Sequence, residues 1–128
     1  HGKFRRQRQM CIRDRLEAEK SNLGDESWAA KQLATLATKS PQSVKVALKQ
    51  IRLGGAMSDF ADNMAMEYAV VSRIVMNPEF HEGVRAVILD KDNDPKWRYA
   101  SIADVPDAEI DAVFAPLPAD QAWVPLEI

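Results

Sequence analysis

Two cap-and-proline pairs, Ser40-Pro41 and Asn77-Pro78, mark positions where this chain has to begin a new helix. The serine or asparagine side chain accepts a hydrogen bond from a free backbone N–H at a helix start, and proline suits the first helical position because it has no N–H of its own. Such pairs also break a helix that arrives from the preceding residues. The chain is therefore predicted to consist of separate helices of moderate length.

Apolar residues recur at helical spacing between these boundaries, and no segment shows the strict alternation of a half-buried strand. Asp25 and Ser58 are predicted to cap two further helices, while Gly24 and Gly54-Gly55 are predicted to end two others. The predicted helices are residues 16–23, a segment after Asp25, 41–54, 59–76, 78–89 and a short helix that starts at Pro106-Asp107. The sequence thus predicts an all-α fold.

Each predicted helix has an apolar face, and these faces are rich in alanine and in methionine, which packs adaptably. Their residues are Trp28, Leu33 and Leu36; Val44, Ala47, Leu48 and Ile51; Phe60, Met64, Val71, Ile74 and Val75; Phe80, Val84, Val87 and Ile88; and Ile110, Val113 and Phe114. The basic residues Lys45, Lys49 and Arg52 fall on the opposite side of their helix. We expect these helices to pack against something larger, either the rest of a longer protein or a second subunit.

Regular structure is predicted to weaken after Leu89. Residues 90–104 have little apolar periodicity but contain Trp97, Tyr99 and Ile102, so a loop pinned by aromatic side chains is expected. Prolines at positions 116, 118 and 125 predict an irregular tail. The expected organisation is a basic segment over residues 1–15, a helical region over 16–115 and a tail over 116–128.

The first fifteen residues differ in charge from the rest of the chain, which has a net charge of -2 as a whole. They contain six lysines and arginines but one acidic residue, Asp14. A basic arm on an acidic body can bind nucleic acid, but this arm has one aromatic residue, Phe4, and no recognisable binding motif. The string Q-M-C-I-R-D-R over residues 9–15 resembles translated sequencing-adapter sequence, so we favour an artefactual segment over a nucleic-acid-binding arm.

Other bulk features narrow the class of protein. No apolar run approaches the roughly 18 residues that a membrane span needs, and the basic start leads into no apolar signal segment. Cys11 is the single cysteine, so a disulfide within the chain is impossible and a reducing compartment is expected.

Metal sites find little support in the sequence. His81 lacks the second helical histidine of a zinc-protease motif, and we expect it to form a cap or a hydrogen bond in the first helical turn beside Glu79 and Glu82. Asp90, Asp92 and Asp94 alternate as in a calcium-binding loop, but the sixth and twelfth places hold Pro95 and Ser101 instead of Gly and Glu. We therefore predict no metal site and interpret the aspartates as a solvated turn.

Catalytic groups are equally hard to assign. The acidic run Asp107, Glu109 and Asp111 is interpreted as the first turn and exposed face of the last helix. Gly54-Gly55 lacks the lysine and hydroxyl residue of a phosphate loop. Lys91 and Lys96 flank the turn beside Trp97, and they are the candidates for contact with a phosphate group because an ammonium binds phosphate as a point charge.

Four pieces of sequence occur in one order: S-P-Q-S-V-K at 40–45, M-E-Y at 66–68, F-H-E-G-V-R-A-V-I-L-D-K-D at 80–92 and P-K-W at 95–97. In this combination the chain resembles the C-terminal region of 3-hydroxyisobutyryl-CoA hydrolases, a branch of the crotonase (enoyl-CoA hydratase/isomerase) superfamily. The resemblance covers residues 40–114. It implies a helical C-terminal fragment of a larger α/β enzyme whose β/α spiral core lies earlier in the chain.

The resemblance also implies a function for the parent protein, the hydrolysis of 3-hydroxyisobutyryl-CoA in valine breakdown. The catalytic motifs of the family belong to the core, so no catalytic residue is assigned here and the fragment alone is expected to be inactive. The implied partners are that core, the acyl-CoA substrate and other subunits, with no further cofactor, and the implied compartment is the cytoplasm in a bacterium or the mitochondrial matrix in a eukaryote. The alternatives are another enoyl-CoA hydratase/isomerase and a non-enzymatic helical interaction module with a basic arm.

Overall fold

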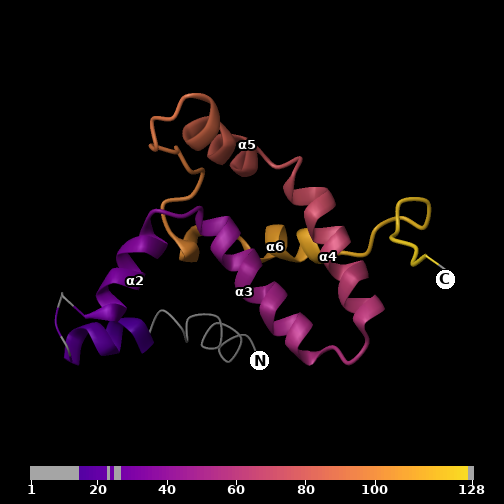
Figure 1. The fold of residues 1–128 in the computed structure, drawn as a ribbon, viewed down its shortest axis with the longest axis horizontal. Helices are drawn as coiled ribbons and strands as arrows, with labels where there is room; N and C mark the ends of the chain where they lie inside the picture. The colour runs from indigo at the N-terminus through magenta and orange to yellow at the C-terminus, as the bar shows by residue number, and fades with distance from the viewer. Residues whose placement is uncertain (1–14, 23, 25–26, 127–128) are drawn as a thin grey trace. The chain divides into compact units, whose positions relative to one another are not determined.

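The computed structural model describes residues 15–22, 24 and 27–126, and Figure 1 shows how its helices follow one another. Residues 15–22 are helical. The later elements are α2 (Trp28–Ala37), α3 (Pro41–Ala56), α4 (Phe60–Ile74), α5 (Pro78–Val84), the π-helical turn η1 (Arg85–Leu89), the 3-10 turn η2 (Ile102–Asp104) and α6 (Asp107–Phe114). These described residues include no strand, so the predicted all-α class is confirmed for them.

The chain forms two compact units, residues 1–39 and 40–128. In the first unit, the helix over residues 15–22 is followed by Gly24, which has a φ of +82° and donates its N–H to the carbonyl of Lys20 at 2.8 Å. Glycine adopts this left-handed conformation without a steric penalty, so the predicted helix end is confirmed. Helix α2 is capped by Ser27 and not by Asp25 as predicted, and Asp25 itself lies outside the described residues.

The second unit begins with the predicted cap of α3. The Ser40 side chain accepts a hydrogen bond from the N–H of Ser43 at 3.2 Å, and the Asn77 side chain caps α5 in the same way. The predicted cap Ser58 is wrong by one residue, because the Asp59 carboxylate accepts the N–H of Ala61 at 2.6 Å. An ionised cap also complements the positive end of the helix dipole, which favours aspartate over serine at this place.

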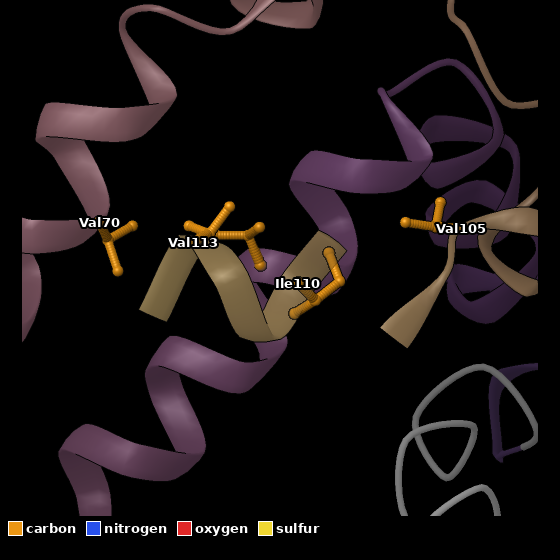
Figure 2. Packing of buried hydrophobic residues seen from close by; sticks show 5 residues of the cluster. Val70, Val105, Ile110 and Val113 are labelled. Carbon is orange, nitrogen blue, oxygen red and sulfur yellow. The ribbon is translucent and has the colours of Figure 1, made fainter. Parts of the chain in front are cut away.

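A small apolar core holds α6 against α3 and α4. Its buried members are Val46, Val70, Val105, Ile110 and Val113, and Figure 2 shows Val70 of α4 facing Val113 of α6. Ile110 and Val105 are each 2% exposed and are the largest of the fully buried side chains. The predicted apolar side of α6 is therefore confirmed.

The predicted buried faces of α3, α4 and α5 are largely wrong. Ile51, Phe60 and Val71 are 73%, 75% and 50% exposed, and Val87 and Ile88 of η1 are exposed as well. The α4 side chains that are buried belong to Ala69 and Val70. Apolar spacing identifies the apolar sides of a helix, but it does not distinguish a side that packs within this chain from a side that stays uncovered.

A pair of lysines that were expected to face solvent instead connects α3 to α6. Lys45 is buried and lies 2.7 Å from the carboxylate of Asp107, while Lys49 lies 2.6 Å from that of Asp111. The lysines and the aspartates are each four residues apart, so both pairs form between the same two helix faces. The acidic run of α6 is thus bound to α3 and is not merely a solvated face.

The irregular segments agree with the sequence. Residues 116–126 form no helix, and the guanidinium of Arg73 contacts the carbonyls of Val113, Ala115 and Pro116 where α6 ends. In the part of the chain that the structure describes, no helix combines the length and the apolar character that a membrane crossing requires.

Candidate functional site

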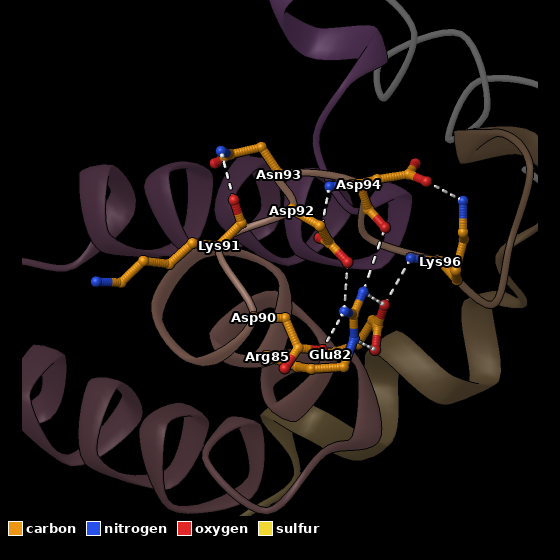
Figure 3. Close-up of polar contacts among 8 residues, drawn as sticks. All are labelled: Glu82, Arg85, Asp90, Lys91, Asp92, Asn93, Asp94 and Lys96. Atoms are coloured by element: carbon orange, nitrogen blue, oxygen red, sulfur yellow. Dashed lines mark hydrogen bonds and ion pairs between the residues drawn. The ribbon is translucent and has the colours of Figure 1, made fainter.

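Many polar contacts of the second unit's described residues lie in the turn that follows η1. Helix α5 passes directly into η1, whose wide turn closes with a hydrogen bond from the N–H of Asp90 to the carbonyl of Arg85 at 2.8 Å. Single π-helical turns inside helices are often found at functional sites. The residues that follow, 90–96, fold back beside Arg85 (Figure 3).

Arg85 is the centre of this turn. Its guanidinium bonds both carboxylate oxygens of Glu82, at 2.8 and 2.9 Å. One of its nitrogens also reaches the carboxylates of Asp90 at 2.7 Å and Asp92 at 2.6 Å. A two-pronged contact of this kind fixes the carboxylate in the plane of the guanidinium, so the geometry is specific as well as attractive.

The charges at the centre stabilise one another. The hydrogen bonds from Arg85 and from the N–H of Lys96 lower the pKa of Glu82 from 4.5 to about 2. The hydrogen bond from Arg85 likewise lowers the pKa of Asp92, and those from Glu82 and Asp92 raise the pKa of Arg85. All of these groups are therefore charged at neutral pH.

The backbone of the turn is strained at two residues. Lys91 and Asn93 have φ values of 56° and 55°, in the left-handed region that residues other than glycine seldom adopt. Each such residue costs on the order of 1 kcal/mol, so the surrounding contacts have to hold the conformation. The N–H of Asn93 donates to the carbonyl of Ala86 at 2.9 Å, which ties the strained segment to η1.

The two candidate phosphate-binding lysines lie on opposite sides of this turn (Figure 3). Lys96 pairs with Asp94, whereas the ammonium of Lys91 points away from the other charged groups and has no acidic partner among the described residues. The structure thus places both lysines on one loop but does not bring their ammonium groups together.

A second polar link connects the same loop to the start of α3. The carboxylate of Glu79 is buried, accepts the hydroxyl hydrogen of Ser40, and accepts the N–H of Arg98 at 2.6 Å. The carboxylate of Glu82 accepts the N–H of Lys96 at 2.7 Å. These two glutamates were expected only to complement the helix dipole, but they also hold the returning segment against α5.

Aromatic residues pin the loop as predicted. A Cβ placed on Gly83 would lie 3.4 Å from the ring of Trp97, so the glycine leaves room for the indole. Tyr99 packs against the core and donates its hydroxyl hydrogen to Glu109 at 2.6 Å, and this contact raises the pKa of the phenol. Glu109 is therefore part of the loop's anchoring and is not simply on an exposed face.

His81 has the hydrogen-bonding role that its position suggested. Its Nε2 lies 2.9 Å from the carbonyl oxygen of Val75, at the end of the preceding helix. Across the residues that the structure describes, no group of three or more histidine, cysteine or carboxylate side chains is arranged to hold a metal ion. Two of the alternating aspartates, Asp90 and Asp92, contact the guanidinium of Arg85, and the third, Asp94, pairs with Lys96.

An open apolar groove of about 630 Å³ lies along α3 and α4 in the same unit. Val70, Val71 and Ile74 of α4 line it together with Val46 and Ala47 of α3, and Trp123 of the tail also contributes to the lining. Polar side chains also line the groove, those of Ser43, Gln50, Glu67 and Tyr68.

Sequence reasoning missed Arg85 as the organising residue of the turn. A weak signal was present, because Glu82 precedes it by three residues, a spacing that places the two side chains side by side on a helix. The contacts with Asp90 and Asp92 depend on the π-helical turn and on the left-handed Lys91, which no residue pattern in the chain indicates.

Comparisons with known proteins give this region a context. A sequence model of the family described as enoyl-CoA hydratase/isomerase matches residues 3–114. The chain is 41% identical over 90 residues to the mitochondrial 3-hydroxyisobutyryl-CoA hydrolase of Gallus gallus, a match that covers 70% of this chain and 23% of that protein. It is 35% identical over 95 residues to the corresponding protein of Dictyostelium discoideum, over 74% of this chain and 25% of that protein.

A solved structure agrees with the sequence matches. The crystal structure of an enoyl-CoA hydratase from Rhodobacter sphaeroides aligns with a TM-score of 0.71 and 31% sequence identity, and it covers 85% of this chain and 31% of that chain. The present chain therefore spans about a quarter of the length of the curated relatives that it matches.

Proposed function

The chain belongs to the enoyl-CoA hydratase/isomerase family, and we propose that it is the helical C-terminal part of a 3-hydroxyisobutyryl-CoA hydrolase. The observation that carries this proposal is the 41% identity to the Gallus gallus hydrolase over 70% of the chain. The parent reaction adds water to the thioester carbonyl and releases 3-hydroxyisobutyrate and the thiol of coenzyme A. Such hydrolysis depends on groups that stabilise the negative charge on the thioester oxygen.

The catalytic groups of this reaction belong to the part of the parent that the matched region does not include. Among the described residues, the arrangement that most resembles a nucleophile with a base is Ser40 beside Glu79. Ser40 faces the carboxylate of Glu79, but the serine is buried and caps α3 with the N–H of Ser43. The chain alone is therefore inactive as a thioesterase.

The chain's role in the parent is to pack against the rest of the protein and to contribute to subunit contacts. Large apolar side chains are exposed on α4, α5 and η1 in the second unit, and such surfaces mark protein contacts when they are extensive. The most exposed of them are Phe60, Val87, Ile88 and Leu89, and Met76 between α4 and α5 is exposed as well. Their exposure supports the proposal that another part of the parent protein covers these side chains.

Lys91 and Lys96 are the residues through which this part contacts the phosphates of acyl-CoA. Lys91 is the stronger candidate, because its ammonium has no acidic partner in the described part of the chain whereas that of Lys96 pairs with Asp94. No further cofactor is proposed. The compartment is the mitochondrial matrix if the source is a eukaryote, in keeping with curated relatives whose names call them mitochondrial, and the cytoplasm if it is a bacterium.

The test compares this chain with a full-length parent protein that contains it. The parent is expected to release free thiol from 3-hydroxyisobutyryl-CoA, and residues 1–128 alone are expected to release none. Turnover by the isolated chain would refute the inactive-fragment proposal.

A second candidate function, that of an enoyl-CoA hydratase, is favoured by the likeness to the Rhodobacter sphaeroides structure. The same protein preparation distinguishes the two, because a hydratase adds water across the double bond of crotonyl-CoA and leaves the thioester intact. Hydration without thiol release would replace the hydrolase proposal. Salt-sensitive nucleic-acid binding by residues 1–15, with neither activity in the parent, would favour the interaction module instead.

A further inference from the structure

The apolar groove along α3 and α4 is not lined by those two helices alone, because a residue of the chain's own tail contributes to it. Trp123 lines the groove together with Val71 and Ile74 of α4. Trp123 is half-buried, whereas every other side chain of residues 119–126 is exposed. Its neighbour Val124, for example, is 75% exposed. The end of the tail therefore contacts the helices through one large aromatic residue.

Arg73 fixes the point at which the tail leaves α6. Its guanidinium donates hydrogen bonds to the carbonyls of Val113 at 3.1 Å, of Pro116 at 3.2 Å and of Ala115. The last carbonyls of a helix have no partner within that helix, so the guanidinium supplies donors where α6 ends. Arg73 belongs to the last turn of α4 and precedes Ile74, a residue of the groove. The anchor of the tail and the groove thus lie on the same end of α4.

The tail then turns back toward the groove. The N–H of Gln121 donates to the carbonyl of Pro118 at 2.9 Å, which closes a turn two residues before Trp123. Figure 1 shows the looped tail beside α4. Pro116 and Pro118 prevent a helix and restrict the backbone, so this segment loses less conformational entropy when it is held in place.

We propose that residues 117–126 form a strap for the α3–α4 groove, in which the Trp123 indole occupies the groove and Arg73 anchors the strap. The groove has a volume of about 630 Å³, within the usual range for small-molecule sites. An apolar ligand of this groove has to displace Trp123 or share the space with it. The family sequence model ends at residue 114, before the strap, so the proposal does not depend on the proposed hydrolase function.

The first test locates the indole by methyl NMR of the complete 128-residue chain. An aromatic ring shifts the resonances of methyl groups close to it, so Trp123→Ala is expected to move the methyl signals of Val71 and Ile74. The methyl signals of Val105 should not move, because this residue belongs to the core and not to the groove. Val124→Ala changes the exposed neighbour and is the matched control, for which the same signals are expected to stay in place.

The second test measures access to the groove with an apolar dye, anilinonaphthalene sulfonate. The apparent affinity of a ligand falls with the fraction of molecules whose site is open, so a strap that covers the groove about nine-tenths of the time weakens dye binding about tenfold. Trp123→Ala, and a chain that ends after Ala115, are each expected to lower the Kd of the dye by that factor. Trp123→Leu keeps an apolar side chain and is expected to have a smaller effect.

Methyl NMR also shows where the dye binds. In the variants without Trp123, added dye is expected to shift the signals of Val71 and Ile74 more than in the unsubstituted chain. Val87 and Ile88 are exposed apolar residues of η1, outside the groove, so their response to the dye should be equal in all variants.

Arg73→Gln tests the anchor separately from the indole. If Arg73 acts by holding the strap, Arg73→Gln is expected to increase dye binding, and Arg73→Gln combined with Trp123→Ala should bind no more tightly than Trp123→Ala alone. Arg52→Gln removes an exposed arginine of α3 and is the control, for which no change is expected. If Arg73→Gln does not fold, the chain that ends after Ala115 still decides whether the tail covers the groove.

Three results overturn the strap. One is a Trp123→Ala variant with unchanged methyl signals and unchanged dye affinity. Another is an equal gain in dye binding with Val124→Ala, because the tail would then have no specific contact in the groove. The third is dye that responds to removal of the tail only at Val87 and Ile88. Additive gains in the combined variant overturn the role of Arg73 as the anchor.

Discussion

The ammonium of Lys45 lies 2.7 Å from the carboxylate of Asp107 and donates a hydrogen bond of the same length to the carbonyl of Val105. The two side chains differ in environment, because that of Lys45 is 10% exposed and that of Asp107 is 62% exposed. The buried lysine thus binds the backbone just before α6 and the first residue of that helix. Since α6 supplies Ile110 and Val113 to the core, this contact joins a surface ion pair to apolar packing.

Replacing Lys45 should destabilise the protein more than replacing Lys49. Lys45→Ala leaves the Val105 carbonyl without its donor, which costs about 1–3 kcal/mol of unfolding free energy. Lys49 makes a more exposed pair with Asp111, so Lys49→Ala is expected to cost less than about 1 kcal/mol. Urea unfolding followed by circular dichroism measures both, and equal losses would contradict the structural difference between the two lysines.

The link between Ser40 and Glu79 should behave as one unit. Ser40→Ala removes a helix cap, at a cost of about 1 kcal/mol, and also removes a donor to the buried carboxylate. Both oxygens of the Glu79 carboxylate accept hydrogen bonds, from the Ser40 hydroxyl and from the N–H of Arg98. Glu79→Gln places an amide N–H₂ opposite one of these donors, at a cost of about 1–3 kcal/mol of unfolding free energy. The double variant should lose less stability than the two single losses combined, as a double-mutant cycle measures. Strict additivity would show that the two side chains are not coupled.

The Arg85 cluster should weaken in acid. The folded pKa of Glu82 is about 2, below its ordinary value of 4.5, so its contribution to stability is fully present above about pH 4.5 and is lost as the pH falls toward 2. The lowered pKa of Asp92 acts in the same direction. Carboxyl-carbon NMR titration should detect the low pKa of Glu82, and Arg85→Gln should raise it toward 4.5. An ordinary pKa in the unsubstituted protein would exclude the two-pronged contact in solution.

Two adjacent valines of α4 offer a matched test of the core. Val70 is 5% exposed and belongs to the core, whereas Val71 is 50% exposed. Val70→Ala is expected to cost about 1–3 kcal/mol, while Val71→Ala should cost less than about 1 kcal/mol. Thermal unfolding of the two variants makes the comparison, and a larger loss for Val71→Ala would indicate that a second molecule covers the α4 face in solution.

The sequence predicted the helix boundaries better than the helix faces. The helix starts at Ser40 and Asn77 depend on one or two adjacent residues. Such local signals can be recognised directly in the sequence. Val71 and Ile51 were expected to be buried because they lie on apolar stripes, but they are exposed. Apolar spacing marks a face that can be covered, but it does not say whether the covering surface belongs to this chain. Under the proposed function, that surface belongs to the rest of the parent protein.

The candidate site was predictable only in part. The phosphate contact by Lys91 and Lys96 stays a prediction. The pinning of the loop by Trp97 and Tyr99 followed from the aromatic residues themselves. The role of Arg85 was not visible, because it requires a π-helical turn and a left-handed lysine to bring three carboxylates to one guanidinium. Such conformations arise from the summed contacts of the turn and leave no pattern in the order of residues.

The cation at the centre of the aspartate turn is covalently part of the chain. A loop held by a metal ion loosens when that ion is scarce or is removed by a chelator, so its shape can follow the composition of the surrounding solution. A guanidinium keeps its charge across the physiological pH range, and because it belongs to a side chain it cannot dissociate from the turn. The conformation of residues 85–96 therefore does not depend on the supply of a bound ion, which suits a structural support and not a sensor.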